Sequence, residues 1–151
     1  MVVTPSPLFN AVLAVPALYN KVAAVTAEGK KVTLNVDKQP LFFEAYWCPH
    51  CQRTLVALNK NKGQLKQLPV IVSEGFLTGT TLAEAVQITH QEFAALHLSG
   101  FQVDYILNPN AGVENAKHGY PTLAFLKRRK TFTLSGEHTV SVWKLALNGE
   151  G

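Results

Sequence analysis

The sequence contains very little cysteine, with only Cys48 and Cys51 among its 151 residues. Because neither has a distant partner, the chain lacks a framework of structural disulfides. The two cysteines must therefore bond to each other, react, bind a metal or have no chemical role. A metal centre usually needs four ligands, and no second cluster of Cys and His residues accompanies this pair. We therefore expect no metal site.

Long apolar runs are also missing, since none approaches the length of a membrane-spanning helix. Residues 1–16 lack the basic start and the clear cleavage site of a complete signal peptide. Two interpretations stay open at this point. The protein is either cytoplasmic, or it is exported and its signal or anchor is not part of this sequence.

Charge is sparse, at 16% of residues, whereas hydrophobic residues make up 47%. This balance argues against disorder and indicates one domain with its own core. The net charge of +4 is scattered, apart from residues 127–130, which we interpret as a solvated hairpin turn. Such a mild excess predicts no nucleic-acid role.

The start of the chain has apolar residues at roughly helical spacing between residues 8 and 25, with Pro16 in their midst. This spacing predicts an N-terminal helix that Pro16 interrupts or kinks. We therefore expect a helical extension over residues 1–30, followed by one domain over residues 31–151.

Strand and helix patterns alternate along the rest of the chain. Strands are expected over residues 31–36, 41–47, 68–73, 101–107, 122–126 and 131–134. Helices are expected over residues 49–62, from the capping box Thr81–Glu84 to residue 98, over 113–118 and over 140–147. This order predicts an α/β fold with a central mixed β-sheet flanked by helices.

Cys48 follows the most apolar strand and precedes a helix, with Pro49 in the first turn. The N-terminus of a helix favours an anion, so we expect Cys48 to be an exposed thiolate nucleophile. Cys51 should lie one turn below as the buried resolving thiol, which attacks a mixed disulfide on Cys48. Pro49 offers no N–H, and His50 adds a cationic or hydrogen-bonding ring. We therefore expect a reduction potential above about −270 mV, the value of thioredoxin.

Residues 43–51, Phe-Glu-Ala-Tyr-Trp-Cys-Pro-His-Cys, resemble the active-site strand and loop of the thioredoxin superfamily. The Cys-Pro-His-Cys form is similar to DsbA-type oxidants and to thioredoxin-like domains attached to vitamin K epoxide reductase homologues. Residues 119–122 resemble the cis-proline loop of the family, and the strand and helix between residues 64 and 98 resemble the TlpA/ResA-like insertion. The resemblance covers residues 31–147. It implies a thioredoxin fold with an inserted strand–helix, to which the expected N-terminal helix would be an addition.

The resemblance also implies which residues surround the dithiol. The Tyr120–Pro121 bond should be cis and lie beside the two cysteines. Substrate contacts are expected from this loop, at Tyr120, Pro121 and Thr122, and from Trp47. The alternative for Trp47 is that its ring only packs on the sheet.

The chain departs from the family at a position that often holds a buried acid, since Phe42 lies there. Glu44 lies two residues later, on the same face of the strand because side chains alternate. We hypothesise that Glu44 relays a proton for Cys51. The alternative is a glutamate that pairs with a lysine or reaches the sheet edge.

The leading functional prediction is an extracytoplasmic thiol–disulfide oxidoreductase that oxidises substrate dithiols, because a reducing cytoplasm would drain an oxidising dithiol. A reductase or isomerase of TlpA/ResA type is the first alternative, and a non-catalytic, redox-dependent binding module is the second. The expected partners are protein thiol and disulfide substrates and a redox recycling partner, for which a membrane protein is one candidate. We expect a monomer and no organic cofactor.

Overall fold

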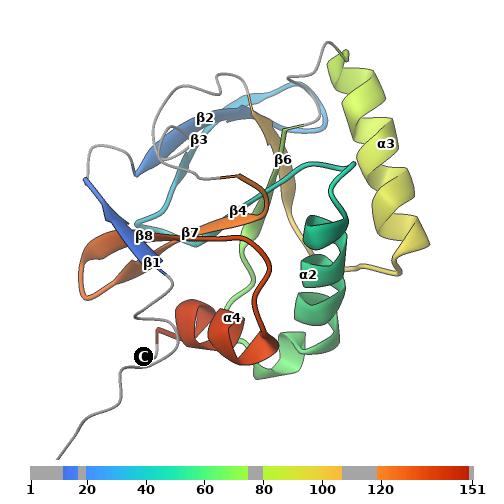
Figure 1. The fold of residues 1–151 in the computed structure, drawn as a ribbon. Helices are drawn as coiled ribbons and strands as arrows, with labels where there is room; N and C mark the ends of the chain where they lie inside the picture. Colours follow the sequence, from blue (N-terminus) through green and yellow to red (C-terminus); the bar gives the residue numbers. More distant parts are fainter. Residues whose placement is uncertain (1–11, 17–19, 75–79, 107–118, 150–151) are drawn as a thin grey trace, which may run out of the picture.

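The structure is a computed structural model that describes residues 12–16, 20–74, 80–106 and 119–149. Over these residues the chain forms an eight-stranded sheet in the order β1-β8-β7-β4-β5-β6-β2-β3 (Figure 1). The parallel centre comprises β4 (Leu41–Glu44), β5 (Val70–Ser73) and β6 (Val103–Ile106). Antiparallel strands flank it: β7 (Thr122–Lys127), β8 (Lys130–Ser135) and β1 (Val12–Val15) beside β4, and β2 (Lys21–Val25) and β3 (Lys31–Asn35) beside β6.

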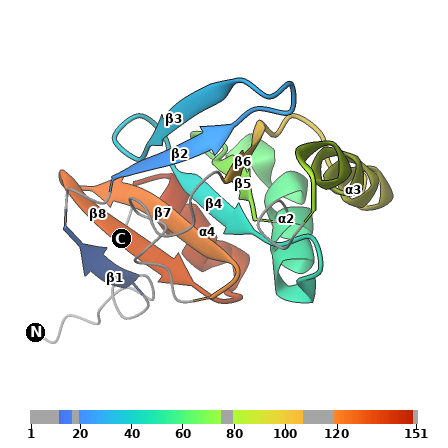
Figure 2. The ribbon, with the colours of Figure 1, turned by 90° about the horizontal axis from the view of Figure 1, so that it is seen from above.

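Helices cover one face of this sheet. Figures 1 and 2 show α2 (Pro49–Lys60) and α4 (Val140–Leu147) together on the same side of β4 and β7, and α3 (Leu82–Ala95) farther along, near β6. A short 3-10 helix, η2 (Lys62–Gln64), follows α2. The core between sheet and helices is centred on large buried side chains, among them Phe42, Leu55, Phe125 and Trp143. The rings of Phe42 and Trp143 meet edge to face, 6.0 Å apart.

The opposite face of the central strands packs against the β2–β3 hairpin. This second core consists of strand and strand-end residues, including Val22, Leu34, Leu41 and Phe43. Leu41 and Phe43 thus point to one side of β4, whereas Phe42 points to the helices. Since side chains alternate along a strand, Glu44 lies on the helix side, as expected.

The prediction of an N-terminal helix is wrong for the residues that the structure describes. Residues 12–15 form β1 and residues 21–25 form β2. β2 pairs with β3 on one side and β6 on the other, and this pairing satisfies its backbone groups without a helix. The boundary expected after residue 30 falls in the turn that joins β2 to β3, two strands of one sheet.

The remaining expected elements are present with small shifts of their ends, and α4 has the expected bounds. The helix expected over residues 113–118 lies outside the described residues. The hairpin turn between β7 and β8 is formed by Arg128 and Arg129, with φ angles of 53° and 65°. In the described part of the chain, no helix has the length and apolar character needed to span a membrane.

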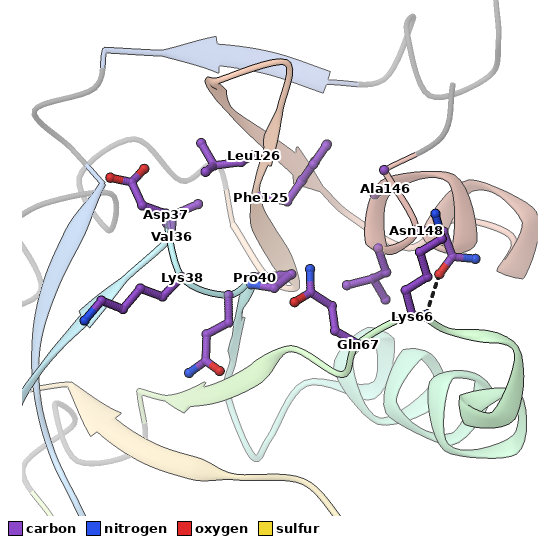
Figure 3. Close-up of a pocket in the computed structure, with 13 residues that line it drawn as sticks. Val36, Asp37, Lys38, Pro40, Lys66, Gln67, Phe125, Leu126, Ala146 and Asn148 are labelled. Carbon is purple, nitrogen blue, oxygen red and sulfur yellow. Dashed lines mark hydrogen bonds between the residues drawn. The ribbon is translucent and has the colours of Figure 1, made fainter.

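A surface pocket lies at the amino end of β4, between the segment 36–40 and the end of α4 (Figure 3). Asn148 closes one side, where its Oδ1 accepts a hydrogen bond of 2.7 Å from the backbone N–H of Lys66. Cys48 follows the carboxyl end of β4, so this pocket lies at the opposite end of the strand and does not belong to the dithiol site.

Candidate active site

Cys48 is the N-cap of α2, and its sulfur is held by the first turn of the helix. The residue has extended backbone angles, φ −94° and ψ 111°, and Pro49 begins the helix. The backbone N–H of Cys51 donates to the Cys48 sulfur over 3.3 Å. A helix begins with N–H groups that lack partners in the helix, and here one of them is directed at Cys48. This geometry favours negative charge on that sulfur.

Both cysteines are free thiols in the structure, and both are largely covered. Cys48 is 9% exposed and Cys51 is fully buried, so Cys48 is the more accessible but less exposed than expected. Tyr120 packs against the cluster of the two cysteines and Ala45, which explains the difference. Burial raises the pKa of the Cys51 thiol, and the nearby Cys48 sulfur and Glu44 carboxyl act in the same direction. Cys51 is therefore a thiol at neutral pH.

The loop before β7 lies against the dithiol. The Tyr120–Pro121 peptide bond is cis, and the carbonyl oxygen of Tyr120 lies 4.0 Å from the Cys48 sulfur. Two segments separated by 72 residues in the sequence thus meet at the reactive sulfur. This placement agrees with what the resemblance implied for the loop.

Aromatic rings surround this meeting point. Trp47 is 47% exposed, and its ring meets those of Tyr46 and Tyr120 edge to face, at 4.9 and 6.3 Å. Thr122 was expected to contact substrate, but the structure buries its side chain. It is fully buried, and its hydroxyl donates to the Gly119 carbonyl over 2.7 Å and pairs with the Ser135 hydroxyl. Its side chain therefore stabilises the loop.

His50 belongs to an exposed ion-pair cluster with Arg53 and Glu137. One carboxyl oxygen of Glu137 lies 2.7 Å from the His50 ring nitrogen Nδ1 and 2.7 Å from Arg53 Nη2. Arg53 Nε also donates to both carboxyl oxygens, over 3.1 and 3.0 Å. The hydrogen bond from Arg53, followed by that from His50, lowers the pKa of Glu137 to about 2. The His50 ring is thus held toward the loop between β8 and α4.

Glu44 ends β4 as a fully buried acid on the helix side of the sheet. Burial raises its pKa well above the usual value, and the neighbouring Glu92 adds to the effect, followed by Cys48 and Glu74. β4 is a central strand, and no described lysine forms an ion pair with Glu44. The sheet-edge alternative is therefore wrong, none of the described lysines is a partner, and the relay hypothesis stays a prediction that requires this buried acid.

Comparison with solved structures shows the same arrangement of elements in several proteins. Mycobacterium tuberculosis DsbF is 17% identical, with a TM-score of 0.60 over 88% of this chain and 96% of that one. StoA from Bacillus subtilis is 19% identical, with a TM-score of 0.59 over 85% and 97%. The exposed lipoprotein thioredoxin Etrx1 of Streptococcus pneumoniae is 17% identical, with a TM-score of 0.60 over 84% and 97%. The chain has a thioredoxin fold. No protein-family model and no curated protein matches the sequence.

Several neighbours of the dithiol in this thioredoxin fold were not predicted from the sequence. Glu92 continues the buried stripe of Ala85 and Thr89 at i+7, so helical spacing could have pointed to it. Arg53 follows His50 by three residues on α2, which is again a helical neighbour. Glu137 lies in a loop and carries no sequence signal that would place it beside His50.

Proposed function

We propose that this chain is a thiol–disulfide oxidoreductase whose reactive group is a reversible Cys48–Cys51 disulfide. One observation carries the proposal: the Cys48 sulfur accepts the Cys51 N–H at the start of α2 and faces the Tyr120 carbonyl. The same sulfur is therefore stabilised as an anion and placed beside the Tyr120–Pro121 loop, which leads into β7. Those are the requirements for exchange with a protein thiol.

The reaction follows from the two positions. In the oxidised form, a substrate thiolate attacks the Cys48 sulfur, the Cys48–Cys51 bond breaks, and Cys51 leaves with the electron pair. A second substrate thiolate then attacks the substrate sulfur of the mixed disulfide and releases Cys48 as a thiolate. Substrate is reduced when the same steps run backward: the Cys48 thiolate attacks the substrate disulfide first, and Cys51 then attacks the mixed disulfide. Trp47, Tyr120 and Pro121 would contact the substrate chain.

Glu44 is proposed as the proton acceptor for Cys51. Only a thiolate attacks a disulfide, and burial keeps Cys51 protonated at neutral pH. Glu44 is a buried acid whose charge influences Cys51, and its own pKa is raised toward the range in which it can exchange a proton. When Cys51 is instead the leaving group, Glu44 returns the proton.

The Cys-Pro-His-Cys sequence supports an oxidant, because Pro49 removes an N–H and His50 adds a ring near the sulfurs. A specific observation favours the reductase or isomerase as second candidate. The His50 ring is paired with Glu137, and the buried Glu44 carboxyl beside Cys51 opposes negative charge there. A positive charge on His50 would raise the reduction potential, whereas negative charge on the nearby carboxyl groups would lower it.

An oxidant would work outside the cytoplasm, where disulfides persist. The fold neighbour Etrx1 is an exposed lipoprotein, which supports this placement. The proposed partners are folding proteins with free thiols and a partner that reoxidises the dithiol, for which a membrane protein is one candidate. The protein would act as a monomer and without an organic cofactor.

The proposal is tested by catalysis of insulin reduction and of refolding of a reduced, disulfide-containing protein. Cys48→Ser should abolish both activities, and Cys51→Ser should accumulate a mixed disulfide on Cys48. Redox-dependent binding without either activity would identify a binding module instead. Equilibration with glutathione separates the directions: a potential near or below about −270 mV would identify the reductant.

A further inference from the structure

The inserted helix α3 brings a second acid to the Glu44 carboxyl. Glu92 lies on the same face of α3 as Ala85 and Thr89, the residues that this helix buries. The carboxyl groups of Glu92 and Glu44 lie within hydrogen-bonding reach of each other. Two acids from separate elements thus meet beside the dithiol.

The two carboxyl groups fit together only if they share a proton. Their oxygens are buried, no described side chain forms a well-placed hydrogen bond with the Glu44 carboxyl, and the Gln52 side chain lies within hydrogen-bonding reach of Glu92. Two adjacent carboxylates in such a site would repel each other strongly. One proton between them removes the repulsion and supplies the missing hydrogen bond, as in other close acid pairs.

Among the residues that the structure describes, the groups that face the pair add no compensating cation. Around Glu44 these are the thiols of Cys48 and Cys51 on α2, the carboxyl of Glu74 after β5, and the phenol of Tyr105 on β6. Beside Glu92 the Gln52 side chain is neutral, and its amide donates to the Tyr46 carbonyl over 2.9 Å. Within the described residues, neither acid forms an ion pair with a basic side chain. The surroundings therefore favour retention of the shared proton.

Only one member of the pair reaches the surface. Glu44 is fully buried, whereas Glu92 is partly exposed. The Glu92 side chain lines an open groove on α3 and α2, together with Tyr46, Gln52, Ile88, Gln91, Ala95 and Leu96. Glu92 thus borders both the groove and the buried acid, while its own carboxyl oxygens are covered.

We infer that Glu92 is the outer half of a proton path, which takes the proton of Cys51 from Glu44 and releases it to solvent in the groove beside α3. The inference rests on the proposed dithiol exchange. In the resting pair Glu44 holds the proton, and its transfer to Glu92 leaves Glu44 as a carboxylate. Glu44 then accepts the proton of the Cys51 thiol, Cys51 attacks the mixed disulfide on Cys48, and the substrate leaves as a thiolate. Glu92 releases one proton to solvent for each attack, so charge and electrons balance.

A two-step reaction of the reduced protein with dithiobis(nitrobenzoate), an aromatic disulfide, isolates the relevant step. The Cys48 thiolate attacks first and releases one coloured thiolate, which reports the first phase. Cys51 then attacks the mixed disulfide and releases the second coloured thiolate. Stopped-flow absorbance over a range of pH gives both rates for each variant.

For Glu92→Gln we expect the first phase to stay within about twofold and the second to slow by about tenfold or more, the range of a lost proton-transfer group. The pH midpoint of the second phase should also fall, because Glu44 loses the neighbouring charge that raises its pKa. Glu92→Asp should slow the second phase less. In Glu92→Ala, azide or formate should restore the second phase, since a small acid can enter from the groove.

The matched control is Glu84→Gln, which removes the same charge from an exposed position on α3 and should change neither phase. Equal slowing of both phases in Glu92→Gln, or no effect of azide and formate, would show a structural role and overturn the inference. A normal second phase in Glu92→Gln but a slow one in Glu44→Gln would overturn it too, and would leave the proposed function intact. Release of only one coloured thiolate by the unmodified protein would contradict the dithiol exchange itself.

Discussion

At the scale of single residues, the Glu44 carboxyl makes the stability of the fold depend on pH. Its pKa in the folded protein lies well above the ordinary value of 4.5 that it has in an unfolded chain. Between these two values the folded state holds a proton that the unfolded state releases. The contribution of Glu44 to stability is therefore fully present below about pH 4.5, and it is lost as the pH rises through the folded-state pKa.

Glu44→Gln should raise the free energy of unfolding near neutral pH, because the amide needs no proton that the unfolded chain would release. Its stability should also fall less steeply than that of the unmodified protein between about pH 5 and about pH 8. Urea denaturation across this range measures both effects. Glu84→Gln serves as the control and should leave the slope unchanged. An identical slope in Glu44→Gln would show that Glu44 does not carry the pH dependence.

Arg53 is the second residue whose charge should affect the dithiol. It interacts with the charge of Cys48 and neutralises Glu137. Arg53→Met removes a cation and leaves the Glu137 carboxylate uncompensated, and both changes disfavour the Cys48 thiolate. We expect the reduction potential to fall by about 10–30 mV, because about 30 mV corresponds to a tenfold change in the equilibrium constant.

Equilibration of Arg53→Met with glutathione measures this shift. Arg53→Lys keeps the charge and should keep the potential within a few millivolts, so it separates charge from packing. An unchanged or higher potential in Arg53→Met would mean that the His50–Arg53–Glu137 cluster is too exposed to influence the sulfurs.

The residues of the site that could be predicted are those whose partners are close in sequence or follow a regular period. Cys48 and Cys51 were predicted because their spacing equals one helical turn, and Glu44 because of alternation along its strand. Glu92 and Glu137 meet the site only through the packing of α3 and of the β8–α4 loop. Helical spacing indicates only that Glu92 faces inward, and no local pattern marks Glu137, because the contacts of both residues depend on the whole fold.

At the scale of elements, the β7–β8 turn holds two non-glycine residues in the left-handed region, Arg128 and Arg129. For an L-amino acid this conformation costs about 1 kcal/mol, and Asn-Gly is the pair that a two-residue hairpin turn of this kind prefers. Arg128→Asn with Arg129→Gly should therefore stabilise the protein by on the order of 1 kcal/mol. Thermal unfolding should show a higher Tm.

The control for the turn is Arg128→Gln with Arg129→Gln, which removes the two charges and keeps the backbone cost. It should leave the Tm close to that of the unmodified protein. An equal rise of Tm in both double variants would assign the gain to relief of charge repulsion among residues 127–130 and would contradict the backbone explanation.

Elements with one clear period were predicted with nearly the observed ends, while the N-terminal segment was not. In α4 the apolar spacing and the turn before it agree, so its bounds followed from the sequence. Between residues 8 and 25, leucines and valines separated by three or four positions imitate a helix, although Val22 and Ala24 also alternate as in a strand. Pairing with β3 and β6 decides in favour of the strand, and only the tertiary structure supplies that pairing.

At the scale of the whole molecule, β2 is part of the common core. It lies between β3 and β6, and Val22 is fully buried among residues of β3, β4 and β5. If residues 21–25 form one cooperative unit with the sheet, their amide hydrogens should exchange at the same free energy as those of β4 and β5. A separate N-terminal unit would exchange at a lower free energy.

Val22→Ala tests this cooperativity. Removal of two buried carbon atoms should destabilise the protein by about 2 kcal/mol, which corresponds to roughly 30-fold faster exchange through global unfolding. The acceleration should be the same in β2 and in β4, as measured by amide hydrogen exchange. Ala14→Gly changes an exposed position on the edge strand β1 and should leave exchange in β4 nearly unchanged. Faster exchange confined to β2 would contradict a single cooperative sheet, because the loss of Val22 would then not reach the strand that ends at Glu44.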